Sequence, residues 1–241
     1  MSVKGSIHSI QSLGTVDGPG IRYVVFLAGC NLRCSCCHNP DTWHCDDGYE
    51  ESPLSLVEKA EKYRAYFGKN GGITLSGGEP LLQPEFVKEV FRLCKEKNIH
   101  TCLDTYGPPL TESIKGTLLL CDKVLLDLKY TTEEFYFKYT KGSLKTTLEF
   151  LRFLNNHGIS TTIRQVVIPT INFDDENFER LYQIVKDYPC VDKIELLPFK
   201  KICEQKYETL KIEFPFKNIP EADPVKVKIA ERALNEKLKQ K

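Results

Sequence analysis

Four of the ten cysteines in this 241-residue chain lie within the short stretch 30–37. Three of them, Cys30, Cys34 and Cys37, form a Cys-x3-Cys-x2-Cys pattern in a loop that follows the apolar run 23–28. Thiolates this close together on one loop can bind a single metal centre, and iron–sulfur clusters are usually held by four of them. Three thiolates on a four-iron cluster would leave one iron open to an atom of a substrate or cofactor, much as catalytic zinc keeps an open position.

The same thiols also allow other kinds of site. Structural zinc usually binds paired Cys-x2-Cys knuckles, and the sequence has no second knuckle after this loop. Disulfides suit an oxidising compartment, whereas the start of the chain lacks the apolar core of a secretory signal. Cys36 is a rival metal ligand, and His38 could be a fourth one, although its place directly after Cys37 makes simultaneous binding awkward. A zinc-binding interaction protein without activity is therefore an alternative.

Six short segments carry a resemblance to a known family. They are, in chain order, 14–22 (GTVDGPGIR), the cysteine loop extended to Trp43, 76–80 (SGGEP), 100–105 (HTCLDT), 126–129 (LDLK) and 194–199 (IELLPF). On these segments the chain resembles the radical S-adenosylmethionine (SAM) enzymes. Among the radical SAM enzymes, the chain is most similar to the activating enzymes of glycyl radical enzymes, in particular to those that activate pyruvate formate-lyase. The resemblance covers nearly the whole chain.

The resemblance implies an oxidoreductase of anaerobic metabolism, with one 4Fe–4S cluster held by Cys30, Cys34 and Cys37. In this family the reduced cluster cleaves SAM, and the resulting 5′-deoxyadenosyl radical takes a hydrogen atom from a glycine of the partner. The implied partner is a glycyl radical enzyme, in particular pyruvate formate-lyase, and the implied electron donor is flavodoxin or ferredoxin. Relatives with further clusters carry a cysteine-rich insert, which this sequence lacks. Activation of another glycyl radical enzyme is one alternative, and a radical SAM enzyme that acts on a small molecule is another.

Several candidates for binding SAM fall just after expected strands. Glycine lets a backbone approach a ligand closely, and the resemblance implies that segment 76–79 contacts the methionine part of SAM. An arginine within the β-branched run 161–168 needs an acidic or ligand partner, so we expect Arg164 on the cofactor side. Cys36 stands where the family usually has an aromatic residue, and Lys200 where many relatives have histidine. The cofactor-binding candidates are Cys36, His38, Ser76, Gly77, Gly78, Glu79, Asp127, Leu128, Lys129, Arg164 and Lys200.

Oxygen atoms at the ends of two expected strands could bind a cation. Carboxylate and hydroxyl oxygens suit a hard cation, although capping of the strand end by the Asp and Thr side chains is the simpler interpretation of the local sequence. The resemblance implies a monovalent cation, Na+ or K+, beside the SAM carboxylate. Its implied ligands are Asp104, Thr105, Leu125 and Asp127.

A turn rich in glycine and proline precedes the strand that leads to the cysteines. Its chemistry is typical of a hairpin loop, whereas the resemblance implies that it helps to receive the glycine segment of the partner protein. The residues concerned are Asp17, Gly18, Pro19 and Gly20.

These candidates need strands and helices that bring them together. Apolar and β-branched runs predict strands near 7–13, 22–28, 73–75, 99–103, 124–128, 161–168 and 191–197. Helical patterns lie between them, the first with Ser52 as its cap and Pro53 in its first turn. Strands and helices alternate about six times, and the candidates follow strands, as in β/α barrels and open α/β sheets. We therefore expect an α/β fold, and the resemblance implies a partial (β/α)6 TIM-like barrel of the radical SAM type.

Length and composition limit the domain organisation and the partners. We expect a single radical SAM domain over 1–241, with a core at about 15–200 and a C-terminal helical extension at about 201–241. Lysine plus arginine and aspartate plus glutamate both number 33, and a net charge of zero argues against a nucleic-acid-binding protein. No apolar run reaches the roughly 18–20 residues needed to span a bilayer. We expect no membrane partner, and a cytoplasmic location that suits unpaired cysteines.

Overall fold

The computed structural model describes residues 3–240, apart from the side chain of Asp47. Residues 1–2 and 241 lie outside the described residues. The first two belong to the segment in which a secretory signal was sought, and the last belongs to the expected C-terminal extension. The chain divides into two compact units. One is formed by Met1–Asn31 and Asp41–Leu125, and the other by Leu32–Pro40 and Leu126–Lys241. The expected single domain over 1–241 stays a prediction.

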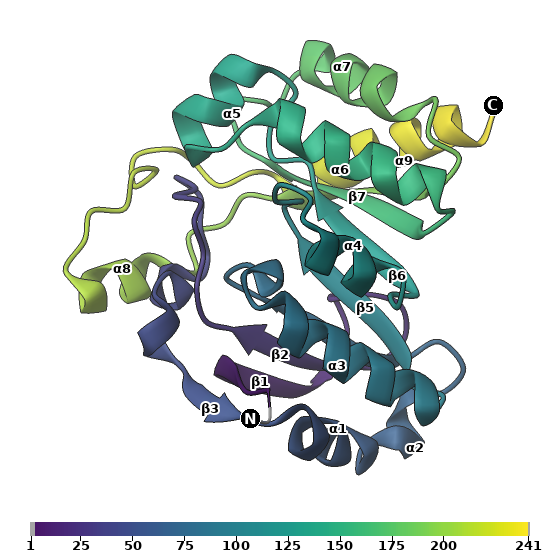
Figure 1. Cartoon of the computed structure of the whole chain (residues 1–241). Coiled ribbons are helices and arrows are strands. Elements are labelled where there is room, and N and C mark those ends of the chain that lie inside the picture. The colour runs from purple at the N-terminus through teal and green to yellow at the C-terminus, as the bar shows by residue number, and fades with distance from the viewer. Residues whose placement is uncertain (1–2, 241) are drawn as a thin grey trace. The chain divides into compact units, whose positions relative to one another are not determined.

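The first unit holds an N-terminal hairpin and three parallel strands with their helices. Its strands are β1 (Gly5–Gly14), β2 (Arg22–Leu27), β3 (Tyr49–Glu51), β4 (Gly72–Gly77), β5 (His100–Thr105) and the first residues of β6 (Lys123–Asp127). Its helices are α1 (Pro53–Glu61), α2 (Arg64–Phe67), α3 (Pro84–Glu96) and α4 (Glu112–Leu118). Short 3-10 turns occupy Pro40–Thr42, Cys45–Asp47 and Pro80–Leu82. Figure 1 shows α1 beside α3, which contacts it.

Sequence signals explain where these elements begin and how they pack. The Ser52 side chain caps α1 by accepting a hydrogen bond from the backbone N–H of Ser55, and Pro53 opens the helix as expected. β4 is a continuous buried run, which is typical of a strand covered on both faces. β2 pairs in parallel with β4, and β4 with β5. The carboxyl ends of these three strands therefore meet at one edge of the sheet.

The second unit holds the last strands and most of the C-terminal helices. Its elements are α5 (Glu133–Thr140), α6 (Leu144–Asn156), β7 (Ser160–Val167), α7 (Asp175–Val185), β8 (Val191–Pro198), α8 (Glu204–Leu210) and α9 (Pro224–Lys239). β7 and β8 are parallel, and Figure 1 shows α7 beside α9. α9 packs against β8, as expected of a C-terminal helix on the outside. The side chain of Asn235 bonds to both the N–H and the C=O of Ile194, which satisfies the exposed edge of this last strand.

The strand order agrees with the expected fold class. Among the described residues, the order of hydrogen-bonded strands is β3-β1-β2-β4-β5-β6-β7-β8, with β6 passing from the first unit to the second. From β2 onward the strands stand in the sheet in the same order as in the sequence, except that β3 pairs with β1 instead. β3 and β8 are the two edge strands and do not pair with each other, so the sheet is not closed. An open α/β sheet of this order is what a partial (β/α)6 barrel requires. Within the described residues, no helix combines the length and apolar character needed to cross a membrane.

Candidate functional site

The first part of the cysteine loop leaves β2 through a tight backbone contact with the end of β4. Gly29 has a φ of 100°, which favours glycine, and its carbonyl accepts a hydrogen bond of 2.8 Å from the N–H of Glu79. The N–H of Gly78 donates to Leu27 at 2.9 Å. A Cβ atom at Gly78 would lie 2.2 Å from the Gly29 carbonyl oxygen. Glycine at both positions therefore lets Cys30 and the candidate SAM segment share one edge of the first unit.

The second part of the cysteine loop is held by α5. The N–H groups of Arg33 and Ser35 donate to the carbonyls of Thr140 and Tyr139, each at 2.8 Å. These carbonyls lie at the C-terminal end of α5, where a helix leaves such groups without a partner of its own. The loop and the helix thus satisfy each other, and the turn that carries Cys34 and Cys37 is fixed in the second unit.

A further set of contacts joins this turn to the region after β8. The Tyr207 hydroxyl donates to the Cys37 carbonyl at 3.2 Å, and the Lys206 ammonium donates to the Asn39 side chain at 2.9 Å. His38 lies 3.0 Å from the carbonyl of Lys200 through its Nε2 atom, which must donate because a carbonyl only accepts. Burial lowers the pKa of His38 and favours its neutral form. The structure thus brings His38 and Lys200 together, although through the backbone of Lys200, whose side chain is exposed.

The thiols of the motif differ in exposure. Cys30, Cys34 and Cys37 are partly exposed, whereas Cys36 is buried at 8% exposure. Burial raises the pKa of the Cys36 thiol to about 12, which keeps it protonated. Exposure thus distinguishes Cys37 from Cys36, and the choice of Cys37 as the third ligand stays a prediction. Cys30 belongs to one unit and the other two cysteines to the other, and their joint binding of one cluster stays a prediction.

Two candidate residues of the second unit form an ion pair near the cysteine turn. The Lys129 ammonium lies 2.5 Å from the Asp127 carboxylate, and both side chains are mostly buried. Burial opposes the charge of Lys129, but the charges of Asp127 and Cys34 outweigh it and hold the pKa of this ammonium well above its usual value. A permanent positive charge therefore lies close to Cys34, where it would stabilise a thiolate.

The ends of β4 and β5 are joined by two polar side-chain contacts in the first unit. The Ser76 hydroxyl donates to Asp104 at 2.8 Å, and the Thr105 hydroxyl donates to both oxygens of Glu79 at 2.8 Å. The Glu79 carboxylate is fully buried and also accepts from the N–H groups of Leu81 and Tyr106. Burial raises the pKa of Glu79 to about 7. In this structure Glu79 links the strand ends, so contact with SAM by its side chain stays a prediction.

The turn at 17–20 is anchored by a buried arginine of the first unit. Arg22 has no exposed surface and donates to Thr74 at 2.9 Å, while the Thr74 hydroxyl donates to the Asp17 carbonyl at 2.7 Å. Side chains two residues apart in a strand share a face, so the turn lies along the face of β4 that carries Ser76. Its predicted contact with a partner is compatible with this position and stays a prediction.

Arg164 lies in the second unit on β7, opposite Glu195 of β8. Its Nε atom is 3.4 Å from the Glu195 carboxylate, and the arginine is 8% exposed. The acidic partner that the sequence required is therefore a neighbouring strand residue. The Arg164 carbonyl accepts from the N–H of Leu128 at 2.9 Å, which ties the candidate segment 127–129 to β7.

Comparisons with known proteins decide the family. The Radical SAM superfamily model matches residues 24–182. A pyruvate formate-lyase-activating enzyme of Clostridium pasteurianum is 43% identical over 240 residues, which cover 98% of this chain and 99% of the relative. This chain belongs to the pyruvate formate-lyase-activating enzymes of the radical SAM superfamily. The pyruvate formate-lyase 1-activating enzyme of Escherichia coli is 42% identical over 221 residues, covering 89% of this chain and 88% of that one.

A solved structure of a related protein has a similar fold. A domain of a pyruvate-formate lyase-activating enzyme from Bacteroides vulgatus matches with a TM-score of 0.57 at 22% identity, covering 70% of this chain and 95% of that chain. At this identity the likeness supports the fold alone. Membership of the family confirms the radical SAM fold class and implies a 4Fe–4S cluster and SAM as cofactors. Because the family consists of enzymes, the alternative of a zinc-binding protein without activity is wrong.

The sequence did not reveal a buried polar network that supports segment 127–129 in this family member. Gln165 donates to the Leu128 carbonyl at 3.2 Å and accepts from Asn177 at 2.8 Å. The Thr131 hydroxyl donates to Asn177 at 2.8 Å, and Arg180 donates to that hydroxyl at 3.1 Å. The signal available in the sequence was a glutamine inside a β-branched strand, since a buried amide requires partners.

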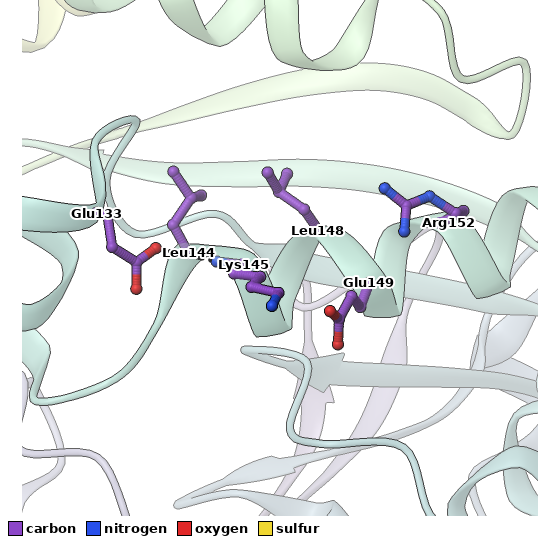
Figure 2. Close-up of a pocket in the computed structure, with 6 residues that line it drawn as sticks. All are labelled: Glu133, Leu144, Lys145, Leu148, Glu149 and Arg152. Atoms are coloured by element: carbon purple, nitrogen blue, oxygen red, sulfur yellow. Dashed lines mark hydrogen bonds between the residues drawn. The ribbon is translucent and has the colours of Figure 1, made fainter.

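A hollow of the second unit is lined by residues of α5 and α6. Its volume is about 290 Å3, and Figure 2 shows the residues that line it, from the start of α5 and from successive turns of α6. They are Glu133, Leu144, Lys145, Leu148, Glu149 and Arg152. None of them is a candidate for cluster or SAM binding, and their charges of both signs select no ligand class.

Proposed function

We propose that this protein activates pyruvate formate-lyase by removing a hydrogen atom from one of its glycines. The observation that carries the proposal is similarity over almost the whole chain to enzymes named for this activity, at 43% and 42% identity. The sequence segments that carry the resemblance span both units, so the similarity is not confined to the cofactor-binding part. Activation of another glycyl radical enzyme is the second candidate, because the chemistry of the site would be the same.

The residues present fit an anionic iron–sulfur cluster. Cys30, Cys34 and Cys37 are the partly exposed thiols of the loop, and the permanent charge of Lys129 lies close to one of them. Thiolates are the usual protein ligands of such clusters. When bound, the cluster supplies the electron that cleaves SAM to the radical which takes the glycine hydrogen atom. The protein supplies placement of the cofactors and exclusion of water.

The proposed SAM-binding residues have distinct roles. We assign the backbone of Gly77 and Gly78 to the methionine part of SAM, and the absence of a Cβ atom lets these two residues pack against the backbone of Leu27 and Gly29. Ser76 is held by Asp104, and Glu79 fixes the two strand ends behind this segment. We assign Lys129, whose positive charge is retained beside Asp127, the role of attracting the SAM carboxylate. Arg164, Leu128, Cys36, His38 and Lys200 remain proposed cofactor-side residues.

We include a monovalent cation and an electron-transfer partner in the proposal. Asp104, Thr105, Leu125 and Asp127 are the proposed ligands of Na+ or K+, and flavodoxin or ferredoxin is the proposed donor. The Thr105 hydroxyl already bonds to Glu79, so cation binding would use its free lone pair or replace that bond. A chain with ten cysteines suits a reducing compartment, and we propose that the protein is cytoplasmic.

Activation of a defined partner tests the proposal. The anaerobically reconstituted protein is mixed with SAM, a reductant and pyruvate formate-lyase, and the glycyl radical is measured by electron paramagnetic resonance. Cys34→Ala should give no radical, whereas the matched control Cys45→Ala, which changes an exposed cysteine outside the motif, should give the wild-type amount. A radical on a different glycyl radical enzyme but not on pyruvate formate-lyase would select the second candidate. SAM cleavage without any protein radical would contradict both.

A further inference from the structure

Tyr106 directly follows the end of β5 and contacts the cysteine loop. Its side chain is mostly buried, at 8% exposure. Its hydroxyl donates a hydrogen bond of 2.7 Å to the side-chain Oδ1 atom of Asn31, the residue after Cys30. The two bonded residues belong to the first unit, although they are 75 positions apart in the sequence. A tyrosine at the end of a core strand therefore holds the loop directly beside the first cysteine of the motif.

The backbone around Tyr106 is fixed by a single buried group. The N–H of Tyr106 donates to the carboxylate of Glu79 at 3.1 Å. The Thr105 hydroxyl donates to the same carboxylate and accepts from the N–H of Gly107 at 3.0 Å. Glu79 has no exposed surface, so water does not compete for these bonds. The Tyr106 hydroxyl is thus presented to the loop from a rigid base.

The loop is also held on the side where it enters Cys30. The N–H of Gly29 donates to the Thr42 carbonyl at 2.8 Å, and its carbonyl accepts from the N–H of Glu79 at 2.8 Å. The N–H of Cys30 donates to the Trp43 carbonyl at 3.1 Å. The direction of a Cα–Cβ bond depends on the backbone on both sides of it, so the Cys30 side chain is oriented only if the chain after it is held as well.

The bond between Tyr106 and Asn31 supplies this second anchor. Asn31 is exposed, and it is the last residue that the loop contributes to the first unit. Because Tyr106 is bound to Glu79, and Glu79 to Gly29, the bond closes a ring of contacts around Cys30. The ring contains the last residue of the candidate SAM segment, so this segment and Cys30 are held together.

We infer that Tyr106 positions Cys30 as a ligand of the cluster, by holding Asn31 through its hydroxyl. The inference rests on the proposed role of Cys30 as a ligand. Hydrogen bonds outside the ligand set orient the ligands of a metal site, and their removal weakens metal binding. Tyr106 acts through Asn31 and is therefore a positioning residue, and its proton stays on the phenol oxygen.

The rate at which Cys30 is alkylated in the loaded protein provides the test. The cluster is loaded anaerobically without SAM, iodoacetamide is added for short times, and the modified cysteines are measured by mass spectrometry. A cysteine reacts as the free thiolate, so a ligand is alkylated only after it leaves the metal. Tyr106→Phe should raise the initial rate at Cys30 about two- to tenfold, the effect of losing one hydrogen bond. The initial rates at Cys34 and Cys37 should not change, and an equal rise at all three cysteines would overturn the inference.

Tyr207→Phe is the matched control. It also removes a phenol hydroxyl that holds the cysteine loop, but the partner of this hydroxyl is the Cys37 carbonyl. This variant should raise the initial alkylation rate at Cys37 and leave the rate at Cys30 at the wild-type value. A rise at Cys30 in Tyr207→Phe as large as that in Tyr106→Phe would show a general loosening of the loop and would contradict the inference.

Asn31→Ala tests the same bond from its other end. It changes an exposed residue, so the test holds even where Tyr106→Phe disturbs folding. Each variant should raise the alkylation rate at Cys30 by the same factor, and the double variant should raise it no further, because both changes remove one bond. Effects that multiply in the double variant would show that the two residues act independently, against the inference.

The failure of the inference can be told apart from the failure of the proposed function. A wild-type protein without bound iron, or a Cys30→Ala variant that loads normally, would overturn the ligand assignment and this inference with it. Normal loading of Tyr106→Phe and Asn31→Ala, with the wild-type alkylation rate at Cys30, would overturn the inference alone. The proposed activation of pyruvate formate-lyase would stand in that case, because Cys30 could hold the cluster without this anchor.

Discussion

Replacing Glu79 with glutamine should change how the stability of the protein depends on pH. The carboxylate of Glu79 is fully buried and links the ends of β4 and β5 through the Thr105 hydroxyl and the N–H of Tyr106. Burial raises its pKa from an ordinary value of 4.5 to about 7, and the hydrogen bonds from Leu81 and Thr105 oppose this rise. The unfolded chain has no such burial, so the two states bind protons differently.

The sign and size of the effect follow from this difference. A carboxyl with a higher pKa in the folded state binds more protons there, so the free energy of unfolding falls as the pH rises from 4.5 through 7. A change in pKa from 4.5 to about 7 corresponds to about 3 kcal/mol. Glu79 thus stabilises the fold most at acidic pH, and this contribution is lost by about pH 8. Glutamine does not titrate, so Glu79→Gln should lack this part of the pH dependence.

Urea unfolding of the reduced, metal-free protein at about pH 5 and pH 8 measures the effect. The free energy of unfolding of Glu79→Gln minus that of wild type should rise by about 2–3 kcal/mol between the two pH values, because pH 5 already lies above the ordinary pKa of 4.5. Glu134→Gln changes an exposed glutamate of α5, and its difference from wild type should stay constant. A constant difference for Glu79→Gln would refute the reasoning, because the carboxyl would then titrate alike in both states.

Three further changes test the contacts that hold the site and the edge of the sheet. Gly78→Ala should weaken SAM binding, measured by anaerobic calorimetry, because its Cβ would lie 2.2 Å from a backbone oxygen of the cysteine loop; an unchanged Kd would contradict this packing. Tyr207→Phe should speed iron loss to a chelator about two- to tenfold, since it removes the bond to the Cys37 carbonyl, and equal rates would show that the bond does not hold the loop. Asn235→Ala should lower the free energy of unfolding in urea by about 1–3 kcal/mol, because the N–H and C=O of Ile194 lose their partner; no measurable loss would mean that water replaces the side chain.

The alternation of strands and helices was predictable because its signals are local. Ser52 and Pro53 marked the start of α1 within one residue, and the buried runs of β4 and β7 were visible as apolar and β-branched stretches. The expectation of an α/β fold then followed from this alternation and from the candidates that come just after strands. These inferences needed only spacing and residue type.

Two helices near the cysteine turn were not predicted, for a physical reason. In α5 the aromatic residues are consecutive, so no helical period stands out, yet Tyr136 is buried and Phe137 is 62% exposed. In α8 only Tyr207 is buried, and the helix is too short for a repeating pattern. Both helices are stabilised by contacts with the cysteine loop, which lies far away in the sequence.

The cofactor residues could be named from the sequence, but their bonds could not. The acidic partner of Arg164 was expected, whereas its identity as Glu195 depends on the register of β7 and β8. The link between His38 and the carbonyl of Lys200 joins residues 162 positions apart. The burial of Glu79 requires two strand ends to meet around it. Each of these depends on tertiary packing that residue type alone does not encode.

The claim that three thiolates hold a cluster with one open iron is tested most directly by a single spectroscopic titration. The anaerobically reconstituted and reduced protein is examined by electron paramagnetic resonance while SAM is added in steps. The account predicts a cluster signal that changes when SAM binds, that is lost in Cys30→Ala, Cys34→Ala and Cys37→Ala, and that persists in Cys36→Ala. A folded protein without iron and sulfide, a signal that ignores SAM, or a signal that depends on Cys36 in place of Cys37 would contradict it.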